Sequence, residues 1–321
     1  MLVATTRSLP KPVGPLTEAL FATLSKAPTG AALPYAAAEA YGHDLQLALY
    51  ACYELHYQGF PGVSDEWEWD PELLRFRAHL EDAFLSALRR DVAGGEDVTG
   101  EVEALLVDSA GTAGYLCDEG EWWQMREYFI HRSIYHLKEA DPHAWVLPRL
   151  RGRAKAALVA VEFDEFGGGR AERMHSQLYA DLLDGAGLDS GYLAYINDVP
   201  APSLALVNMM SLFGLHRGLR GALVGHFAAA EITTAPAAKR MEKALERMQA
   251  HPVCIRFYTE HIEADAVHEQ VLRHEVLGDL LEREPELAAD VVLGIQATEL
   301  LETHLADHLM TNWKAGRSSL L

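Results

Sequence analysis

Almost every long segment of this 321-residue chain places its apolar residues at the spacing of an α-helix rather than in the alternation of a strand. Proline and glycine interrupt the pattern, most clearly at the triple glycine of residues 167–169. No repeat with a period of about 20 to 50 residues occurs, which disfavours a helical solenoid. The sequence therefore predicts an all-α protein, with helices at 15–26, 35–58, 70–92, 98–111, 120–140, 150–166, 170–186, 202–230, 236–249, 252–280 and 286–314.

Composition and charge narrow the classes of function. The chain is 49% hydrophobic, enough for a core of its own, and we expect an N-terminal extension over residues 1–14 followed by a single helical domain over residues 15–316. The formal net charge of −20 argues against a nucleic-acid binder, which needs a basic patch, and against an anionic membrane surface as partner. No GxGxxG follows a strand, and neither GxxxxGK[ST] nor GxSxG occurs, so nucleotide-fold and serine-hydrolase readings lack support.

The cysteines and the N-terminal residues indicate in which cellular compartment the protein is expected. Cys52, Cys117 and Cys254 are widely spaced and odd in number, so we expect reduced thiols rather than a disulfide framework or a CxxC metal site. The N-terminal residues lack the pattern of a signal peptide, and no stretch approaches the ~18 uncharged apolar residues of a membrane span. We therefore expect a cytoplasmic protein.

One short stretch, HIEADAVH at residues 261–268, carries three side chains that can bind metal ions. Positions i, i+4 and i+7 of a helix lie on one face. His261, Asp265 and His268 are therefore predicted to form a stripe of two imidazoles and one carboxylate. The meaning of this stripe depends on whether the rest of the chain supplies partners for it.

Candidate partners occur at three other places. Glu139 lies in the last turn of a predicted helix, where the helix dipole disfavours a carboxylate. Glu165 and His175 flank the triple glycine, whose flexibility would let residues ten apart converge. Glu231 lies among alanines and an isoleucine, and a buried carboxylate needs a partner. Taken one at a time, an exposed charge and a surface loop are the alternative readings of the first two places.

Together these positions supply four carboxylates and three imidazoles, a set of donors that suits two divalent ions. Four negative charges would balance a pair of ferrous ions, which makes burial of the set tolerable. The predicted metal ligands are Glu139, Glu165, His175, Glu231, His261, Asp265 and His268, and the glutamates among them are also the predicted catalytic residues.

Two other pairs have ligand-like spacing. Glu172 and His175 form an ExxH pair, as in ferritin-like diiron bundles, but that architecture needs a second such pair, which the sequence lacks. His304 and His308 lie four apart on a predicted helix without another supporting motif. We interpret the second pair as part of a solvated face.

The predicted helical segment 203–234 is unusually rich in glycine. Each interior glycine costs about 1 kcal/mol against alanine, so the four of them need a reason. Either another backbone approaches closely, or the helix bends over a buried site. The glycines are Gly214, Gly218, Gly221 and Gly225.

The order of these elements resembles that of the haem-oxygenase-like diiron oxidases. The similarity rests on Glu139 in LKEADPHAW, Glu165 to His175 in DEFGGGRAERMH, Glu231 in GHFAAAE, and HIEADAVH, and it runs from about residue 35 to 316. The stretch at residues 44–60, DLQLALYACYELHYQGF, is also similar to the family's N-terminal helices. The resemblance implies a seven-helix haem-oxygenase-type bundle with added N-terminal helices, which binds two ferrous ions in place of haem.

The resemblance also implies a chemistry. Such enzymes activate O2 at the diiron site and hydroxylate an amine nitrogen, cleave a carbon–carbon bond of an amino acid, or convert a fatty acid to an alkene. Because all seven ligand positions are filled as in the N-oxygenating members, N-oxygenation of an amine-bearing small molecule is the favoured reading, with oxidative carbon–carbon cleavage as the alternative. Glu162, Asp164 and Glu263 are candidates for orienting the metal-binding histidines. An external electron donor and a homodimer are compatible with the sequence.

Other classes of function use a similar bundle. Thiaminase-like hydrolases need no metal, and they would not require three histidines opposite four carboxylates. The chain could also be a helical binding partner without catalytic activity. In that case the predicted metal ligands would be ordinary polar surface residues. A haem-binding version is disfavoured because no histidine near the first helix stands out as a proximal ligand. Iron analysis separates the metal-free hydrolase from the diiron enzyme.

Overall fold

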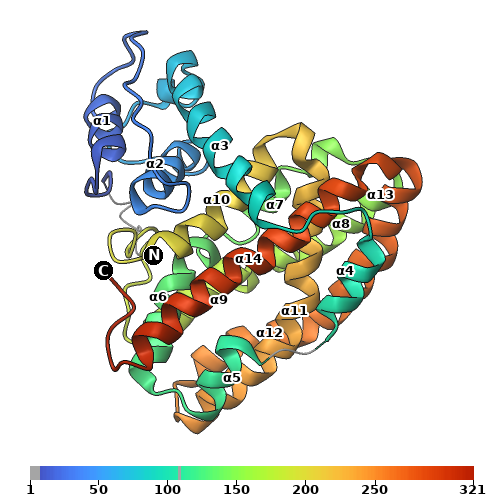
Figure 1. The fold of residues 1–321 in the computed structure, drawn as a ribbon. Coiled ribbons are helices and arrows are strands. Elements are labelled where there is room, and N and C mark those ends of the chain that lie inside the picture. Colours follow the sequence, from blue (N-terminus) through green and yellow to red (C-terminus); the bar gives the residue numbers. More distant parts are fainter. Residues whose placement is uncertain (1–7, 108–109) are drawn as a thin grey trace.

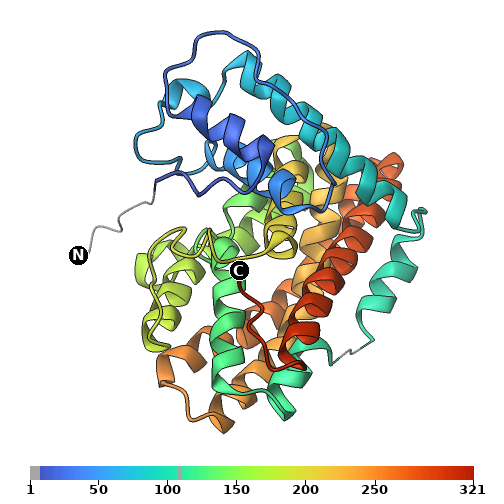
Figure 2. The same cartoon turned by 60° about the vertical axis from the view of Figure 1, so that its left-hand side comes forward.

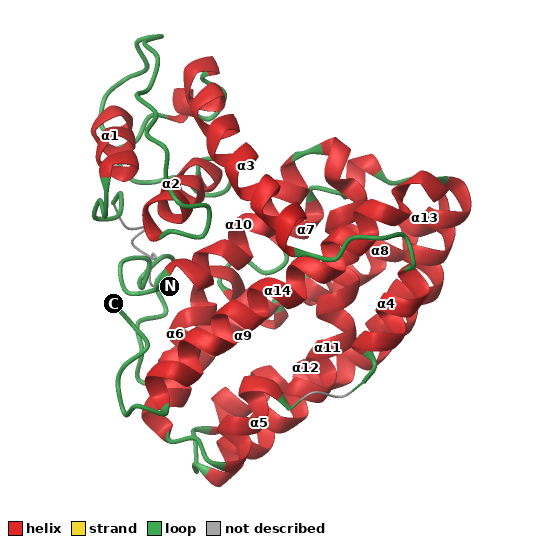
Figure 3. Cartoon of the chain, viewed as in Figure 1, coloured by secondary structure: helices red, strands yellow, loops and turns green. Residues whose placement is uncertain are grey.

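The computed structural model describes residues 8–107 and 110–321, and within residues 263–266 it describes the backbone alone. The described chain is helical and contains no strand (Figure 3), so the predicted all-α class is confirmed. A π-helical segment, Val271–Leu277, joins the last two helices before the C-terminal one. The α-helices are α1 (Pro15–Leu24), α2 (His43–Glu54), α3 (Pro71–Asp91), α4 (Val98–Leu105), α5 (Gly111–Asp118), α6 (Trp122–His136), α7 (Asp141–Ala144), α8 (Gly152–Glu165), α9 (His175–Gly185), α10 (Ala201–Leu215), α11 (Arg220–Arg247), α12 (Pro252–Gln270), α13 (Gly278–Arg283) and α14 (Ala288–Trp313).

Local sequence signals set several helix ends. At the start of α3, the Asp70 side chain accepts hydrogen bonds from the backbone N–H groups of Glu72 and Leu73, and a proline occupies the first helical position. Arg89 and Arg90 lie in the last turn of the same helix, where positive charge complements the helix dipole. Helix α12 also begins at a proline, Pro252. These boundaries agree with the predicted ones to within a residue or two.

The three largest departures from the predicted helices are as follows. The predicted helix 35–58 is helical only from His43 to Glu54, because none of residues 35–42 is buried and they gain little from packing. The predicted helix 98–111 ends at Leu105, and α5 occupies a segment where no helix was predicted.

The third error concerns the glycine-rich segment, which forms two helices rather than one. The break lies at His216, whose backbone is extended, and Pro236 lies inside α11 instead of ending it. An interior proline costs about 3 kcal/mol in a helix. Helix α11 withstands it because α12, α14 and α5 all pack against it.

The helices that carry the candidate ligands pack together in one region. Helix α11 packs between α14 and α12, α9 packs on α12, and α8 packs on the π-helical segment that follows α12. Figures 1 and 2 show α14 running along the body of the molecule, with α1, α2 and α3 gathered at one side of it. None of the helices in the described part of the chain has the length and apolar character needed to cross a lipid bilayer.

Close backbone packing explains the glycines of α11. A Cβ atom built on Gly225 would lie 2.1 Å from the carbonyl oxygen of Val291 in α14, and one on Gly294 would lie 2.0 Å from the carbonyl oxygen of Ala222. Any larger side chain at either position would push α11 and α14 apart. Of the two readings of the glycine-rich segment, close approach of another backbone is therefore the one that the structure supports.

Candidate metal centre

Two groups of metal-ligating side chains lie buried among α8, α9, α11 and α12. In each group, one ligand atom from every residue lies within 4.8 Å of the others. None of these residues is more than 7% exposed. The first triad is Glu139, His175 and His261, and the second triad is Glu165, Glu231 and His268.

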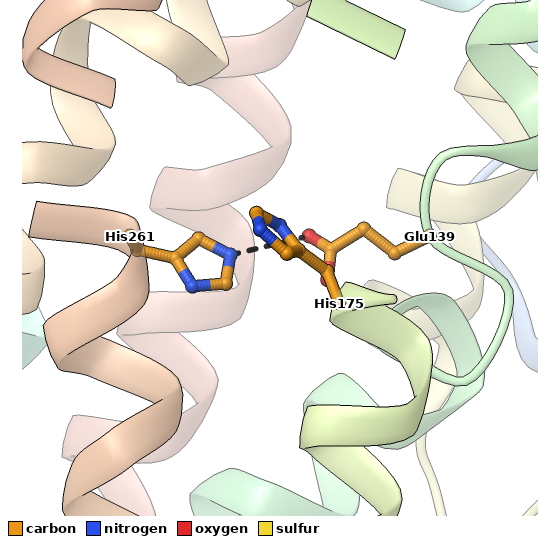
Figure 4. A group of neighbouring side chains, drawn as sticks. All are labelled: Glu139, His175 and His261. Atoms are coloured by element: carbon orange, nitrogen blue, oxygen red, sulfur yellow. Dashed lines mark ion pairs between the residues drawn. The ribbon is translucent and has the colours of Figure 1, made fainter. Parts of the chain in front are cut away.

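The first triad joins three separate elements (Figure 4). Glu139 lies in the turn between α6 and α7, His175 is the first residue of α9, and His261 projects from α12. The Nδ1 atom of His261 lies 2.7 Å from the carbonyl oxygen of Phe257. A carbonyl can only accept, so Nδ1–H is the donor. In the neutral ring, Nε2 then keeps its lone pair and lies 3.8 Å from Glu139 Oε1.

The second triad is built around His268. Its Nδ1 atom lies 3.1 Å from Glu231 Oε2 and 3.5 Å from Glu165 Oε1. Its Nε2 atom lies 3.3 Å from Asp164 Oδ2. An imidazole with one nitrogen toward the site and the other held by a carboxylate has the arrangement usual for a metal-binding histidine. The sequence-based expectation that Asp164 orients a histidine agrees with this contact.

The triple-glycine turn brings the two triads together. Helix α8 ends at Glu165 and α9 begins at His175, and all three glycines between them have positive φ angles, from 63° to 79°. The turn folds back so that Glu165 Oε2 lies 2.7 Å from His175 Nδ1. The predicted convergence of these two residues is therefore present in the structure.

The two α12 histidines belong to different triads. His261 and His268 are seven residues apart, which corresponds to about 10.5 Å along a helix. Each triad therefore takes one histidine from α12. Asp265, the remaining predicted ligand, lies between them in sequence, and its side chain is outside the described residues.

Burial and charge compete at the acidic ligands. Burial alone would raise the pKa of Glu139, but His136 and His261 beside it hold that pKa well below its usual range. Burial raises the pKa of Glu231, and the nearby Glu165 carboxylate adds to the effect, while His268 opposes it. Burial lowers the pKa of His268, yet the surrounding carboxylates, led by Glu231, raise it to about 9. A protonated His268 thus partly neutralises the second triad.

The donor atoms fit divalent metal ions. Glu139 Oε2 is buried without a hydrogen-bond partner, and His175 Nδ1, although close to Glu165, lacks hydrogen-bond geometry toward it. Buried polar atoms are normally paired, so atoms that converge without donors need another partner. Imidazole nitrogen and carboxylate oxygen are suitable ligands for ferrous iron.

The other residues singled out in the sequence lie as follows. Glu172 is exposed. His304 packs edge-on against Tyr41, with ring centroids 5.1 Å apart, and His308 Nε2 lies 2.7 Å from the carbonyl oxygen of Ser319. Neither histidine belongs to a triad. Both are half-buried and make contacts within the protein, so their interpretation as part of a solvated face needs correction. The side chain of Glu263 is outside the described residues.

Sequence reasoning missed His136. Its Nδ1 atom lies 2.9 Å from Glu139 Oε1, and its ring stacks on Tyr179 with centroids 4.6 Å apart. The imidazole therefore lies beside the same carboxylate oxygen that His261 faces, without hydrogen-bond geometry toward it. A histidine three residues before a glutamate at the end of a helix was the available signal.

Comparison with known proteins gives two results. The chain matches the family described as iron-containing redox enzymes over residues 126–303. It is also 26% identical over 221 residues to the nitrosourea synthase of Streptomyces achromogenes subsp. streptozoticus, an alignment that covers 68% of this chain and 44% of that protein. The chain therefore spans less than half the length of this relative.

The family match covers more than half of the chain and includes every residue of both triads. The sequence-based resemblance to a haem-oxygenase-like family of iron enzymes is confirmed. This protein belongs to the family of iron-containing redox enzymes.

Proposed function

We propose that the protein is an O2-activating non-haem diiron oxygenase that oxygenates a nitrogen atom of an amine-bearing small molecule. The observation that carries the proposal is the pair of adjacent buried triads, each of which combines imidazole and carboxylate donors. Membership of a family of iron enzymes supports ferrous iron as the metal. The presence of two buried triads supports two metal positions.

Each triad would bind one of the two ions. Glu139, His175 and His261 would hold one ion, and Glu165, Glu231 and His268 the other. Glu165 would contribute to both positions, because one of its oxygens lies 2.7 Å from His175 and the other lies 3.5 Å from His268. With Asp265 included, four carboxylates would balance the charge of two ferrous ions.

The chemistry at the ions requires a defined supply of electrons. When bound, two ferrous ions supply two electrons that, together with two from the substrate nitrogen, reduce O2 so that one oxygen atom enters an N–H bond and the other leaves as water. An external reductant must then restore the ferrous state. The protein's own residues orient the ligands: the Phe257 carbonyl fixes the tautomer of His261, and Asp164 holds His268.

The similarity to a nitrosourea synthase supports nitrogen as the atom that is oxidised. A nitrosourea contains an oxygenated nitrogen, so an enzyme that makes one performs chemistry of the proposed kind. The present chain would carry out N-oxygenation on a substrate that the fold alone does not identify.

Loading with iron followed by labelled oxygen tests this proposal. The protein is loaded anaerobically with ferrous iron, and iron per chain is measured. It is then exposed to oxygen-18 gas with a panel of primary amines and guanidines, and products are analysed by mass spectrometry. We expect two irons per chain and one labelled oxygen on a substrate nitrogen. Labelled carbon fragments without nitrogen oxidation would indicate oxidative carbon–carbon cleavage instead and contradict the proposal.

A further inference from the structure

Glu162 is a buried carboxylate that belongs to neither triad. It lies on α8 one turn before Glu165, and it is only 3% exposed. Both of its carboxyl oxygens are buried, and neither has a hydrogen-bond partner among the residues that the structure describes. The next residue, Phe163, is 58% exposed, so Glu162 faces the interior while the opposite side of α8 faces solvent.

Three acidic side chains lie close enough to Glu162 to affect its pKa. Burial raises the pKa of this side chain to about 9, and the nearby carboxylates of Glu165, Glu231 and Asp141 add to the effect. Among the described residues, every charged group with a marked influence on Glu162 is therefore negative. An unpaired buried carboxylate of this kind is costly unless something positive joins it.

Lys138, a buried lysine in the described part of the chain, already has partners of its own. Lys138 donates to Glu54 at 2.9 Å, and its ammonium group lies 4.5 Å and 4.3 Å from the ring centroids of Tyr50 and Tyr57. This arrangement satisfies Lys138 inside its own cluster. It does not compensate Glu162.

The charge of two ferrous ions can be balanced without Glu162. Four carboxylates, Glu139, Glu165, Glu231 and Asp265, would balance two ferrous ions. Glu162 is a fifth carboxyl group, one helical turn from Glu165, and its raised pKa keeps it protonated near pH 7 unless a cation binds beside it. A cationic group from outside the chain would favour the ionised carboxylate.

We propose that Glu162 binds a cationic nitrogen group of the substrate, a protonated amine or a guanidinium, next to the metal centre. This inference rests on the proposed function, because it places the substrate beside the ions that would oxidise it. Glu162 would act as a binding residue that selects for positive charge. Asp141, a half-buried carboxyl near it, would favour the same charge.

Binding of a charged probe and its neutral analogue tests the proposal without turnover. The probes are n-butylammonium chloride and N-butylacetamide, titrated calorimetrically and anaerobically into ferrous-loaded protein. We expect the ammonium to bind more tightly than the amide. In Glu162→Gln the ammonium affinity should fall by about ten- to one-hundred-fold, the effect of losing a buried charged hydrogen bond. The amide affinity and the iron content should not change.

Glu172→Gln is the matched control, because it makes the same substitution at an exposed position shortly after α8. It should bind both probes as the parent does. If Glu162→Gln does not fold, Glu162→Asp keeps the charge and shortens its reach, and it should lower ammonium affinity more than amide affinity. Loss of iron from Glu162→Gln would make this residue part of the metal site and overturn the proposal. Equal binding of the two probes by the parent would overturn it as well.

The outcomes also separate this inference from the proposed function. Selective ammonium binding through Glu162, with no labelled oxygen on any nitrogen, would leave the binding site in place and refute N-oxygenation. Labelled oxygen on nitrogen, with ammonium binding unchanged in Glu162→Gln, would support N-oxygenation and refute the binding role of Glu162.

Discussion

Glu165 Oε2 lies 2.7 Å from His175 Nδ1 across the turn that contains the three consecutive glycines. The contact joins the two triads, since Glu165 belongs to one and His175 to the other. The conformation of this turn therefore controls whether the two metal positions are adjacent.

Replacing Gly167 should separate the triads. Gly167 has a φ of +69°, and a Cβ there would lie 2.6 Å from the backbone of Arg173. We expect Gly167→Ala to weaken ferrous iron binding by at least about tenfold, because the turn must open to admit the methyl group. Gly187→Ala is the control: its φ is +68°, but nothing lies within 4 Å of the added Cβ. Both variants should lose about 1 kcal/mol of unfolding free energy, and equal iron affinity in the two would argue against the role of the turn.

Removing one imidazole from the first triad should remove one metal ion. His175→Ala should bind about one iron per chain and lose O2-dependent turnover while its circular dichroism remains that of the parent. His304→Ala should keep two irons and near-parental activity, because His304 packs on Tyr41 and belongs to neither triad. The reverse pattern would mean that the ligands are assigned wrongly.

A buried histidine far from the triads gives a pH dependence of stability. The two ring nitrogens of His131 lie 2.9 Å and 2.8 Å from the hydroxyls of Ser203 and Ser319. Burial, helped by the positive charges of His308 and Arg132, lowers the pKa of His131 to about 3. The neutral His131 side chain therefore contributes fully to the free energy of unfolding above pH ~6.5. As the pH falls toward 3, protonation in the unfolded state removes up to roughly 4–5 kcal/mol of that free energy.

Denaturant unfolding between pH 7 and pH 4 measures this contribution. His131→Gln should show a shallower loss of unfolding free energy with acid than the parent, because it has no group to protonate at this position. His304→Gln should follow the parent. Identical pH profiles for the parent and His131→Gln would show that His131 titrates normally.

Metal binding should order the helices that carry the second triad and the α12 histidines. Without cations the gathered carboxylates repel one another, and this repulsion opposes the packing of the helices that hold them. Ferrous iron removes that repulsion. We expect slower amide hydrogen exchange over residues 203–234 and 255–275 with iron than without it, and unchanged exchange in α3. Equal protection in both states would mean a preformed site.

Part of this site could be predicted from the sequence. Helical spacing placed His261 and His268 on one helix, and the triple glycine indicated that Glu165 and His175 would meet. The helical spacing did not show that the α12 histidines would serve different triads. That division depends on where α8 and α9 pack against α12, which is a matter of tertiary structure.

The errors in helix boundaries have a similar origin. Residues 35–42 are rich in alanine, a good helix former, but they lack a buried face and stay irregular. Pro236 carries a strong breaking signal, yet packing on three sides keeps α11 continuous. His136 was overlooked because its importance comes from contact with Glu139 and Tyr179, which no periodic pattern reveals.

The position of the iron tests the central claim most directly. Crystals of the protein loaded anaerobically with ferrous iron would be measured on both sides of the iron absorption edge, so that anomalous difference maps locate each ion. The account predicts two peaks in every chain. One should lie among Glu139, His175 and His261, and the other among Glu165, Glu231 and His268. A single peak, or peaks at His304 and His308 instead, would contradict it.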